Sequence, residues 1–317
     1  MEQKGKETVI MKHNLFLPEG RLIYTAANKN ATSSAEALER AFADGTVLEG
    51  ICCLCDNEHN LHVRVGQYTG IIPHEECVYL RDGERPKDIA IISRVGKPLC
   101  FKIKQILPDG NLILSRRAAQ RECMLSYIDS LSAGDVISAR VTHMESFGVF
   151  VDVGCGIVSL LPIDTLSVSR IAHPKDRLYP GQDINVVVKT PSMGSGRISL
   201  SHRELLGTWQ ENAALYSPGQ TAAGIIRSIE NYGVFVELTP NLAGLAEYKE
   251  GVEVGRSAAV YIKSIIRDKM KIKLVIIDTY PTEGQPLPLN YFIKQGHIDY
   301  WRYSPIECPK LVESIFA

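Results

Sequence analysis

Short runs of alternating apolar and polar residues fill most of the chain, and this period of two is typical of β-strands. The alternation restarts three times, each time after a glycine, at Gly45, Gly134 and Gly219. A short run with helix-like spacing precedes each restart, at residues 35–42, 123–131 and 205–215. The pattern therefore predicts an internal repeat of three units, each with about five short strands separated by turn residues.

The three units share further landmarks at equivalent positions. Each contains a second glycine, and eight residues after it stands a lysine: Lys104, Lys189 or Lys263. Each unit then closes with a strand-like run that begins at Asn111, Arg197 or Lys271. Five strands in roughly 70 residues is the size of a small closed barrel of the oligonucleotide/oligosaccharide-binding (OB) type. We therefore predict an all-β chain of three tandem five-stranded OB-type barrels linked by short helices.

This repeat divides the chain into predicted segments. The barrels are expected at residues 45–117, 133–203 and 219–278, and the linker helices at 118–132 and 204–218. Residues 1–44 are expected to form an N-terminal arm and a short helix, and residues 279–317 a tail rich in proline and aromatic residues. The tail cluster Tyr300-Trp301-Arg302-Tyr303 could stack on bases, but we expect it to pack against the neighbouring barrel.

Charge and composition limit the functional classes. The formal net charge of the 317 residues is −1, so a nucleic-acid surface would need local clusters of lysine and arginine. The apolar runs are too short to span a bilayer, and the N-terminus lacks the charged-then-apolar order of a signal peptide. The eight cysteines are too sparse for a disulfide scaffold. We expect a cytoplasmic protein with reduced thiols and no membrane partner.

An aromatic-Gly-x-aromatic sequence recurs in the second and third units, as residues 147–150 and 232–235. Strict alternation would put the two rings of each pair on opposite faces of a strand. The glycine between them permits a bulge or kink that brings both rings to one face, where they would make a stacking platform for unpaired bases. Burial in the core is the more usual fate of an isolated pair, but the repeated glycine favours exposed rings.

The second and third units resemble the S1-type RNA-binding domain, which is known from bacterial ribosomal protein S1 and from RNA-degrading and transcription-associated proteins. The resemblance covers residues 133–278 and rests on the aromatic turn, a following Gly-Leu-Val-His motif and a closing Arg/Lys-Ile-x-Leu-Ser motif. In the second of these motifs, Ser159 and Glu247 stand where the family often has histidine. The resemblance also implies that Arg197 and Lys271 line the face that carries the rings.

The first unit lacks the aromatic pair, so we predict that it is a degenerate copy. With one gap in the alignment, His59 and His62 take the places of the two rings; without the gap, Glu58 and Leu61 do. Such a barrel could serve as a docking module for protein instead of binding RNA.

The first unit also contains Cys52, Cys55, His59 and His62, whose residue types suit zinc. The gap between the two pairs is shorter than in a zinc finger, and the cysteines lie in an apolar run, so reduced core cysteines are the expected outcome. No glycine-rich phosphate loop, catalytic triad or cluster of carboxylates stands out in the sequence. We therefore expect no metal, no cofactor and no catalytic residues, and a protein that is not an enzyme.

The predicted function is binding of single-stranded or unstructured RNA with little sequence specificity. The predicted RNA-binding residues are Phe147, Phe150, Ser159, Lys189, Arg197, Tyr232, Phe235, Lys263 and Lys271. The rings would stack on bases and the cations would neutralise phosphates, whereas Asp152, Glu237 and Glu247 are expected to lie nearby and weaken binding. The resemblance implies a role in translation, with the ribosome (its 30S subunit) or messenger RNA as partner. The alternative is a protein-interaction scaffold or an accessory subunit of an RNA-processing complex.

Overall fold

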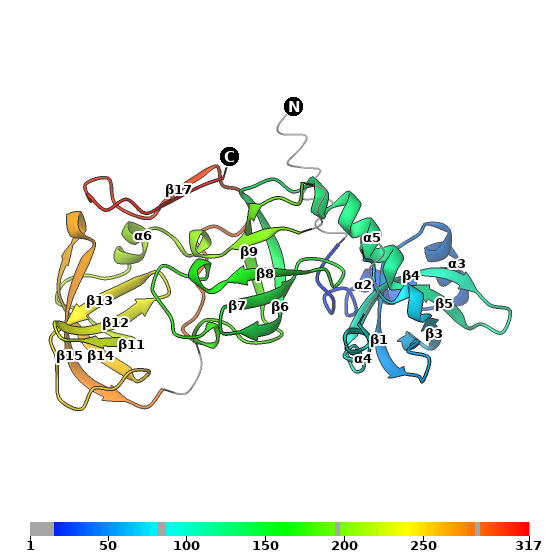
Figure 1. Cartoon of the computed structure of the whole chain (residues 1–317), viewed down its shortest axis with the longest axis horizontal. Helices are drawn as coiled ribbons and strands as arrows, with labels where there is room; N and C mark the ends of the chain where they lie inside the picture. Colours follow the sequence, from blue (N-terminus) through cyan, green and yellow to red (C-terminus); the bar gives the residue numbers. More distant parts are fainter. Residues whose placement is uncertain (1–15, 81–86, 194–196, 283–285, 317) are drawn as a thin grey trace.

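Three β-barrels follow one another along the chain (Figure 1). The structure is a computed structural model, and it describes residues 16–80, 87–193, 197–282 and 286–316. Barrel 2 lies in the centre, with barrel 1 on one side and barrel 3 on the other (Figure 1). The predicted all-β fold of three tandem barrels is confirmed. The first fifteen residues of the predicted N-terminal arm lie outside the described residues.

Barrel 1 is closed in the strand order β1-β2-β3-β5-β4. Its strands are β1 (Leu48–Cys55), β2 (Leu61–Val65), β3 (Tyr68–Ile72), β4 (Pro98–Ile106) and β5 (Leu112–Ser115). In β2, Leu61, Val63 and Val65 are buried, while the two residues between them are not. The period of two in the sequence is therefore the division between core and surface.

Barrels 2 and 3 repeat this topology. Barrel 2 contains β6 (Asp135–Glu145), β7 (Gly148–Asp152), β8 (Val158–Pro162), β9 (Asp183–Thr190) and β10 (Ser199–Ser201). Pairing of β6 with β9 closes it, and β16 (Gly296–His297) adds to the edge of β6. Barrel 3 contains β11 (Thr221–Glu230), β12 (Gly233–Thr239), β13 (Leu242–Ala246), β14 (Ser257–Ile266) and β15 (Lys271–Tyr280).

Each barrel encloses its own apolar core. Phe101 is buried in the core of barrel 1, Val151 in that of barrel 2 and Val236 in that of barrel 3. Phe16, from the segment before barrel 1, is 4% exposed and belongs to the core cluster of barrel 2. The chain thus crosses from barrel 2 to barrel 1 before its first strand begins.

Short helices precede the barrels and connect their strands. The α-helices are α2 (Ala26–Ala31), α3 (Ala35–Ala43), α4 (Asp88–Ile92), α5 (Arg116–Ser126) and α6 (Trp209–Ala213). The 3-10 helices are η1 (His74–Glu76), η2 (Ile128–Ser130), η3 (Ile163–Thr165), η4 (Pro174–Asp176), η5 (Arg203–Leu206) and η6 (Arg267–Lys269).

The helix expected at residues 123–131 begins earlier than predicted, at Arg116. Ser115 explains the difference, because this last residue of β5 accepts a hydrogen bond from the backbone N–H of Ala118 at 2.8 Å. A serine in this position caps the helix and starts it directly after the strand. The helix expected at residues 205–215 is shorter than predicted, since η5 and a break at Gly207 precede α6.

The C-terminal segment returns to barrel 3. Its strands β17 (Tyr300–Arg302) and β18 (Glu313–Ile315) pair with each other. Trp301 and Tyr303 are buried in the core cluster of barrel 3, and the Tyr303 hydroxyl donates a hydrogen bond to the Asn241 carbonyl oxygen at 2.6 Å. The prediction that the aromatic cluster packs against the neighbouring barrel is confirmed for these two rings. Tyr300 is exposed, and its hydroxyl group donates a hydrogen bond to the Glu313 carboxylate.

Glu49, in β1, holds the N-terminal segment (residues 16–24) on barrel 1. Its carboxylate accepts hydrogen bonds from the backbone N–H groups of Gly20, Leu22 and Ile23 at 2.8–3.0 Å. The Glu49 side chain is nevertheless removed from water, and this burial raises the pKa of its carboxyl group from 4.5 to about 7. The native state therefore favours the protonated form of Glu49 more than the unfolded chain does.

Glu49 is expected to make the free energy of unfolding fall as the pH rises from about 4.5 to about 7. In this window the native state binds more protons at Glu49 than the unfolded state, and the slope is at most about 1.4 kcal/mol per pH unit. In Glu49→Gln, the measured stability should lack this decrease. Urea unfolding of both proteins across that pH range checks it, and equal slopes in the two would contradict the assignment.

Candidate nucleic-acid interface

The aromatic pair of barrel 2 lies on the outer surface where β6 turns into β7. Phe147, in the turn, is 54% exposed, and Phe150, in β7, is half-buried. Their ring centroids are 6.1 Å apart and the ring planes are nearly perpendicular. The imidazole of His143 stacks on the other side of Phe150, with a centroid distance of 6.2 Å. Barrel 2 therefore presents three neighbouring rings, of which the sequence analysis had predicted only two.

Barrel 3 repeats the pair with the same geometry. Tyr232 is 69% exposed, Phe235 is half-buried, and their centroids are again 6.1 Å apart with perpendicular planes. The counterpart of His143 is Ser228. In barrel 2, His143 of β6 pairs with Phe150 of β7, and in barrel 3, Ser228 of β11 pairs with Phe235 of β12. Barrel 3 therefore presents two rings where barrel 2 presents three.

The glycine between the rings acts differently from the prediction. The extra residue that forms a bulge lies on the facing strands β6 and β11, not at Gly148 or Gly233. A side chain at Gly148 would meet the Leu161 carbonyl oxygen at 2.7 Å, and one at Gly233 would meet the Ala246 carbonyl oxygen at 2.4 Å. The glycines are therefore needed because the neighbouring strand passes so close.

The strand register places each half-buried ring in a row of outward residues that runs across the whole barrel. In barrel 2 the row is His143, Phe150, Leu160, Ser199 and Thr190. In barrel 3 it is Ser228, Phe235, Leu245, Lys273 and Ser264. We call these residues the outer rows of the barrels. They place polar or charged residues of the last two strands on the same surface as the rings.

The recurring lysines occupy one structural position. Lys104, Lys189 and Lys263 each lie at an irregularity between the last two paired strands of their barrel, and all three are exposed. Lys189 precedes Thr190, and Lys263 precedes Ser264, so both adjoin the end of an outer row. Lys104 differs, because its ammonium group lies 2.7 Å from the Glu76 carboxylate.

Two further cations lie beside the rows. Arg197 and Lys271 are exposed and stand two residues before Ser199 and Lys273, respectively. Alternation along β15 puts Lys271 and Lys273 on the same face. Lys273 was not among the predicted residues, although the sequence Lys271-Ile272-Lys273 carries the signal.

In barrel 1 the register decides between the two alignments. His62 pairs with Leu54 as Phe150 pairs with His143, so His62 stands in the place of the half-buried ring and His59 in that of the exposed ring. The alignment with one gap is therefore correct. The rest of the barrel 1 outer row is mainly apolar: Leu54, Ile71, Ile113 and Gln105.

The motif alignment of Ser159 with Glu247 is wrong. Ser159 pairs with Val151, as Gly244 pairs with Val236, so Ser159 is the counterpart of Gly244. Ser159 is also buried, with 8% of its surface exposed. It is the least accessible of the predicted RNA-binding residues.

Asp152 and Glu237 do not lie beside the rings, contrary to the prediction, because both are buried at contacts between barrels. Asp152 accepts hydrogen bonds from the backbone N–H groups of Glu19, Gly154 and Gly156 at 2.7–3.0 Å. Burial, together with the nearby Glu19 carboxylate, raises the pKa of Asp152 to about 7. Glu247 is exposed, as expected.

Asp152 and Glu237 each lie at a polar contact that joins two barrels. The carboxylate of Glu19 pairs with Arg116 of α5 at 2.7 Å and accepts a hydrogen bond from the Cys100 N–H of barrel 1. Although burial opposes it, the charge of Arg116 keeps the pKa of Glu19 below its usual value. Glu237 of barrel 3 accepts hydrogen bonds from Arg177 of barrel 2 at 2.8 Å and from Arg227 at 2.6 Å.

The four side chains of the first unit whose types suit zinc, Cys52, Cys55, His59 and His62, do not form one site in the part of the chain that the structure describes. There, His59 approaches His74 and Asp88 instead, and His62 forms a hydrogen bond with Asp56 at 3.1 Å. Within the described residues, no helix combines the length and the apolar character needed to span a membrane.

Closed five-stranded barrels in tandem, with an exposed aromatic pair on two of them, define a class of protein built from repeated OB-type barrels. Residues 130–203, which contain barrel 2, match the family model described as the S1 RNA binding domain. Barrel 2 is therefore similar to the S1 RNA binding domain, and the chain resembles ribosomal protein S1.

The relatives that support this resemblance are longer than this chain. The chain is 31% identical over 205 residues to small ribosomal subunit protein bS1 of Staphylococcus haemolyticus. The matched region covers 59% of this chain and 52% of the relative. The chain is 30% identical to bS1 of Staphylococcus aureus (strain COL), with the same shares covered. The chain thus spans about half the length of these curated relatives.

A solved structure of a multidomain protein with nucleic acid binding domains from Streptococcus pneumoniae also matches. It is 15% identical, covers 74% of each chain and has a TM-score of 0.25.

Proposed function

We propose that the protein binds single-stranded or unstructured RNA through barrels 2 and 3. The observation that carries this proposal is the pair of perpendicular rings, one exposed and one half-buried, that recurs with one geometry on both barrels. Every base has a π-face, so rings of this kind stack on unpaired bases with little regard to sequence. In barrel 2, His143 extends the stacking surface by one ring. The match of residues 130–203 to an RNA-binding family supports the same function.

Phosphate contacts come from the cations beside the outer rows. Lys189 and Arg197 serve barrel 2, while Lys263, Lys271 and Lys273 serve barrel 3. Because the net charge of the chain is only −1, these local cations supply the electrostatic part of the binding. Ser159 is left out of this interface because it is buried.

The role in the cell follows from the resemblance to bS1. We propose that the protein acts in translation in the cytoplasm, without catalysis, in contact with messenger RNA or the 30S ribosomal subunit. The division of the chain set out above, with an RNA-binding barrel at 133–203 and another at 219–278, is part of this proposal.

A second candidate function, docking of a protein partner, rests on barrel 1. Its outer row contains Ile71 and Ile113, which are half-buried, and Leu54, which is 53% exposed. An apolar row without an aromatic pair suits a protein surface better than it suits RNA. In this account barrel 1 anchors the chain to a complex while barrels 2 and 3 hold RNA.

Filter binding with single-stranded RNA, duplex RNA and single-stranded DNA of matched length tests the main proposal. Stacking on unpaired bases requires that single strands bind more tightly than the duplex. If the protein binds none of the three nucleic acids at low salt, the proposal of RNA binding is wrong, and docking of a protein partner is left as the candidate function.

The salt dependence of RNA binding is expected to reveal the phosphate contacts. Each phosphate neutralised on a single strand contributes roughly −0.7 to the slope of log K against log salt concentration, so five cations predict about −3.5. In Lys189→Ala/Lys263→Ala the slope should be smaller by about 1.4, and all RNA sequences should lose affinity alike.

A matched control is Lys29→Ala/Lys310→Ala, which removes two exposed lysines outside barrels 2 and 3. The control should keep the wild-type slope. If both double variants lowered the slope equally, Lys189 and Lys263 would contribute to RNA binding only through the net charge of the protein.

A further inference from the structure

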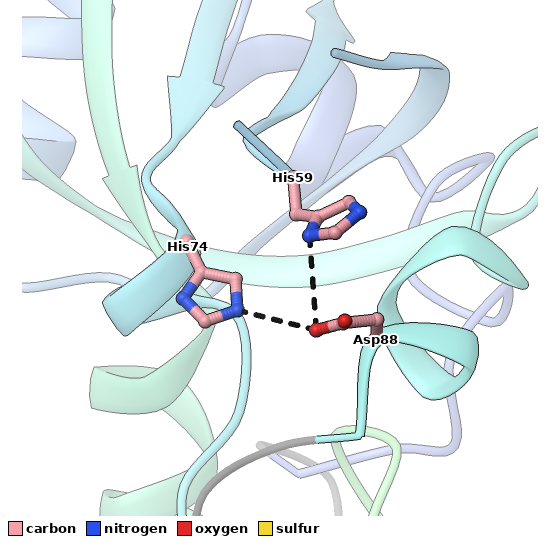
Figure 2. A group of neighbouring side chains, drawn as sticks. All are labelled: His59, His74 and Asp88. Atoms are coloured by element: carbon pink, nitrogen blue, oxygen red, sulfur yellow. Dashed lines mark ion pairs between the residues drawn. The ribbon is translucent and has the colours of Figure 1, made fainter. Parts of the chain in front are cut away.

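Three side chains from separate segments of barrel 1 converge on one point, as Figure 2 shows. They are His59 from the turn between β1 and β2, His74 from η1, and Asp88 from the first turn of α4. Their ligand atoms, two imidazole nitrogens and a carboxylate oxygen, all lie within 4.8 Å of one another. Within the described residues, this is the group of three or more such side chains that could hold a metal ion.

The distances within the group suit a bridging ion better than direct hydrogen bonds. His59 Nδ1 lies 3.7 Å from Asp88 Oδ1, and His74 Nε2 lies 3.8 Å from the same oxygen. A hydrogen bond between such atoms would be about 2.7–3.2 Å long. Around a tetrahedral zinc ion with bonds of about 2.0–2.1 Å, neighbouring ligand atoms are about 3.3 Å apart. The two nitrogen–oxygen distances therefore exceed the spacing around zinc by only a few tenths of an ångström.

The backbone holds the two histidines in place relative to each other. Asp56 Oδ1 accepts hydrogen bonds from the N–H groups of Glu58 and Asn60, which fixes the turn that carries His59. The side-chain oxygen of Asn60 then accepts a hydrogen bond from the His74 N–H at 3.0 Å. One asparagine therefore links the segment of the first ligand to that of the second. Such support from outside the ligand set is what metal sites require.

His59 also has an unusual backbone conformation. Its φ is +62°, in the left-handed region that is uncommon for residues other than glycine, although asparagine, aspartate and histidine are enriched there. Strain of this kind costs about 1 kcal/mol or more and persists where the surroundings enforce it. Here the Asp56 turn enforces it, and the imidazole is directed toward His74 and Asp88.

The position within the barrel distinguishes this group from a stacking platform. His59 and His62 stand where barrels 2 and 3 have their ring pairs. Unlike those pairs, the two imidazoles have different partners. His62 forms a hydrogen bond with Asp56, whereas the ring centroid of His59 lies 6.1 Å from that of His74. At the two ring positions, barrel 1 therefore has one imidazole, His59, that belongs to the group with His74 and Asp88, and one, His62, that does not.

We propose that His59, His74 and Asp88 form a binding site for a divalent transition-metal ion, with Zn²⁺ as the best match. Two imidazoles and one carboxylate are ligands that zinc accepts, whereas magnesium and calcium prefer oxygen ligands alone. Three protein ligands leave one tetrahedral position for water or another ligand. The side chains of His59, His74 and Asp88 are 35%, 39% and 60% exposed, so that position can be reached from solvent.

Calorimetric titration of the full-length, chelator-treated protein with Zn²⁺, in the presence of a phosphine reductant, tests the site. The wild type should bind one ion at this site. His59→Asn, His74→Gln and Asp88→Asn should each weaken this binding by more than about 100-fold, since loss of a mere outer-shell partner already costs 10–100-fold. Asparagine is chosen at position 59 because it tolerates a positive φ.

The matched control is His143→Gln, which removes an exposed imidazole that also has a carboxylate partner, Glu145, but no third ligand. It should bind Zn²⁺ like the wild type. Thermal unfolding without metal, equal in all variants, would exclude misfolding as the cause of lost binding.

Absorption spectra with Co²⁺ distinguish this site from binding by cysteine thiolates. Ligation by nitrogen and oxygen gives visible bands without the near-ultraviolet charge-transfer band of thiolate ligands. The proposal is overturned if the wild type binds no Zn²⁺, if the three variants bind it as tightly as the wild type, or if the Co²⁺ spectrum shows thiolate ligation. The site is independent of RNA binding, so failure of either proposal leaves the other standing.

Discussion

Replacing Arg177 by alanine is expected to lower the free energy of unfolding by about 3–5 kcal/mol, because it breaks a buried ion pair and leaves a charged carboxylate behind. The side chains of Arg177 and Glu237 are both fully buried. Arg177 donates hydrogen bonds to Glu237 and, through Nε, to the Ser167 hydroxyl at 2.9 Å. Without Arg177, only Arg227 would remain as a hydrogen-bonding cation for Glu237.

Urea unfolding followed by tryptophan fluorescence measures this effect. The chain has two tryptophans, Trp209 and Trp301, and both lie in the core cluster of barrel 3. As a control, Lys104→Ala removes an ion pair whose lysine side chain is 55% exposed, and it should cost no more than about 1 kcal/mol. Equal losses in the two variants would mean that the buried pair has no special weight.

Phe147→Ala/Phe150→Ala is expected to weaken binding of single-stranded RNA by about 1–3 kcal/mol for each lost stack. The protein should stay folded, because Phe147 is 54% exposed and the barrel 2 core is built from other residues, such as Val149 and Val151. Fluorescence anisotropy with a labelled single-stranded RNA measures the affinity, and thermal unfolding checks the fold.

Tyr179→Ala is the matched control for the ring pair. Tyr179 is 56% exposed, but it lies between η4 and β9 and is not part of the outer row. Its removal should leave RNA affinity unchanged. If the double variant aggregates while Tyr179→Ala is stable, then Phe147 and Phe150 support the core and are not a platform.

Much of the fold could be predicted because barrel strands alternate between core and surface. Leu61, Val63 and Val65 show this period directly, and its threefold recurrence gave the number of barrels. The exposed ring positions followed from the repeated aromatic-Gly-x-aromatic sequence. The start of α5 was missed because Ser115 ends a strand and caps a helix at the same time, so no turn separates the two.

The roles of Asp152, Glu237 and Ser159 could not be predicted from local sequence. Glu237 is buried because Arg177, sixty residues earlier, comes from another barrel to meet it. Asp152 is buried because the N-terminal segment, 133 residues earlier in the sequence, packs against it, and the Glu19 N–H donates a hydrogen bond to its carboxylate. Ser159 was misaligned because the chain between β7 and β8 differs in length from that between β12 and β13, and only strand pairing reveals this.

The buried acid Glu237 also determines how the two aromatic pairs can work together. Where flexible linkers join binding modules, the chance that a second module finds the same strand depends on linker length. Here Glu237 binds Arg177 of barrel 2 inside the protein, so the separation of the two ring pairs is set when the chain folds. In the proposed binding mode, an RNA long enough to span both pairs would gain the second contact without the entropy cost of ordering a linker, and a shorter RNA would gain no second contact.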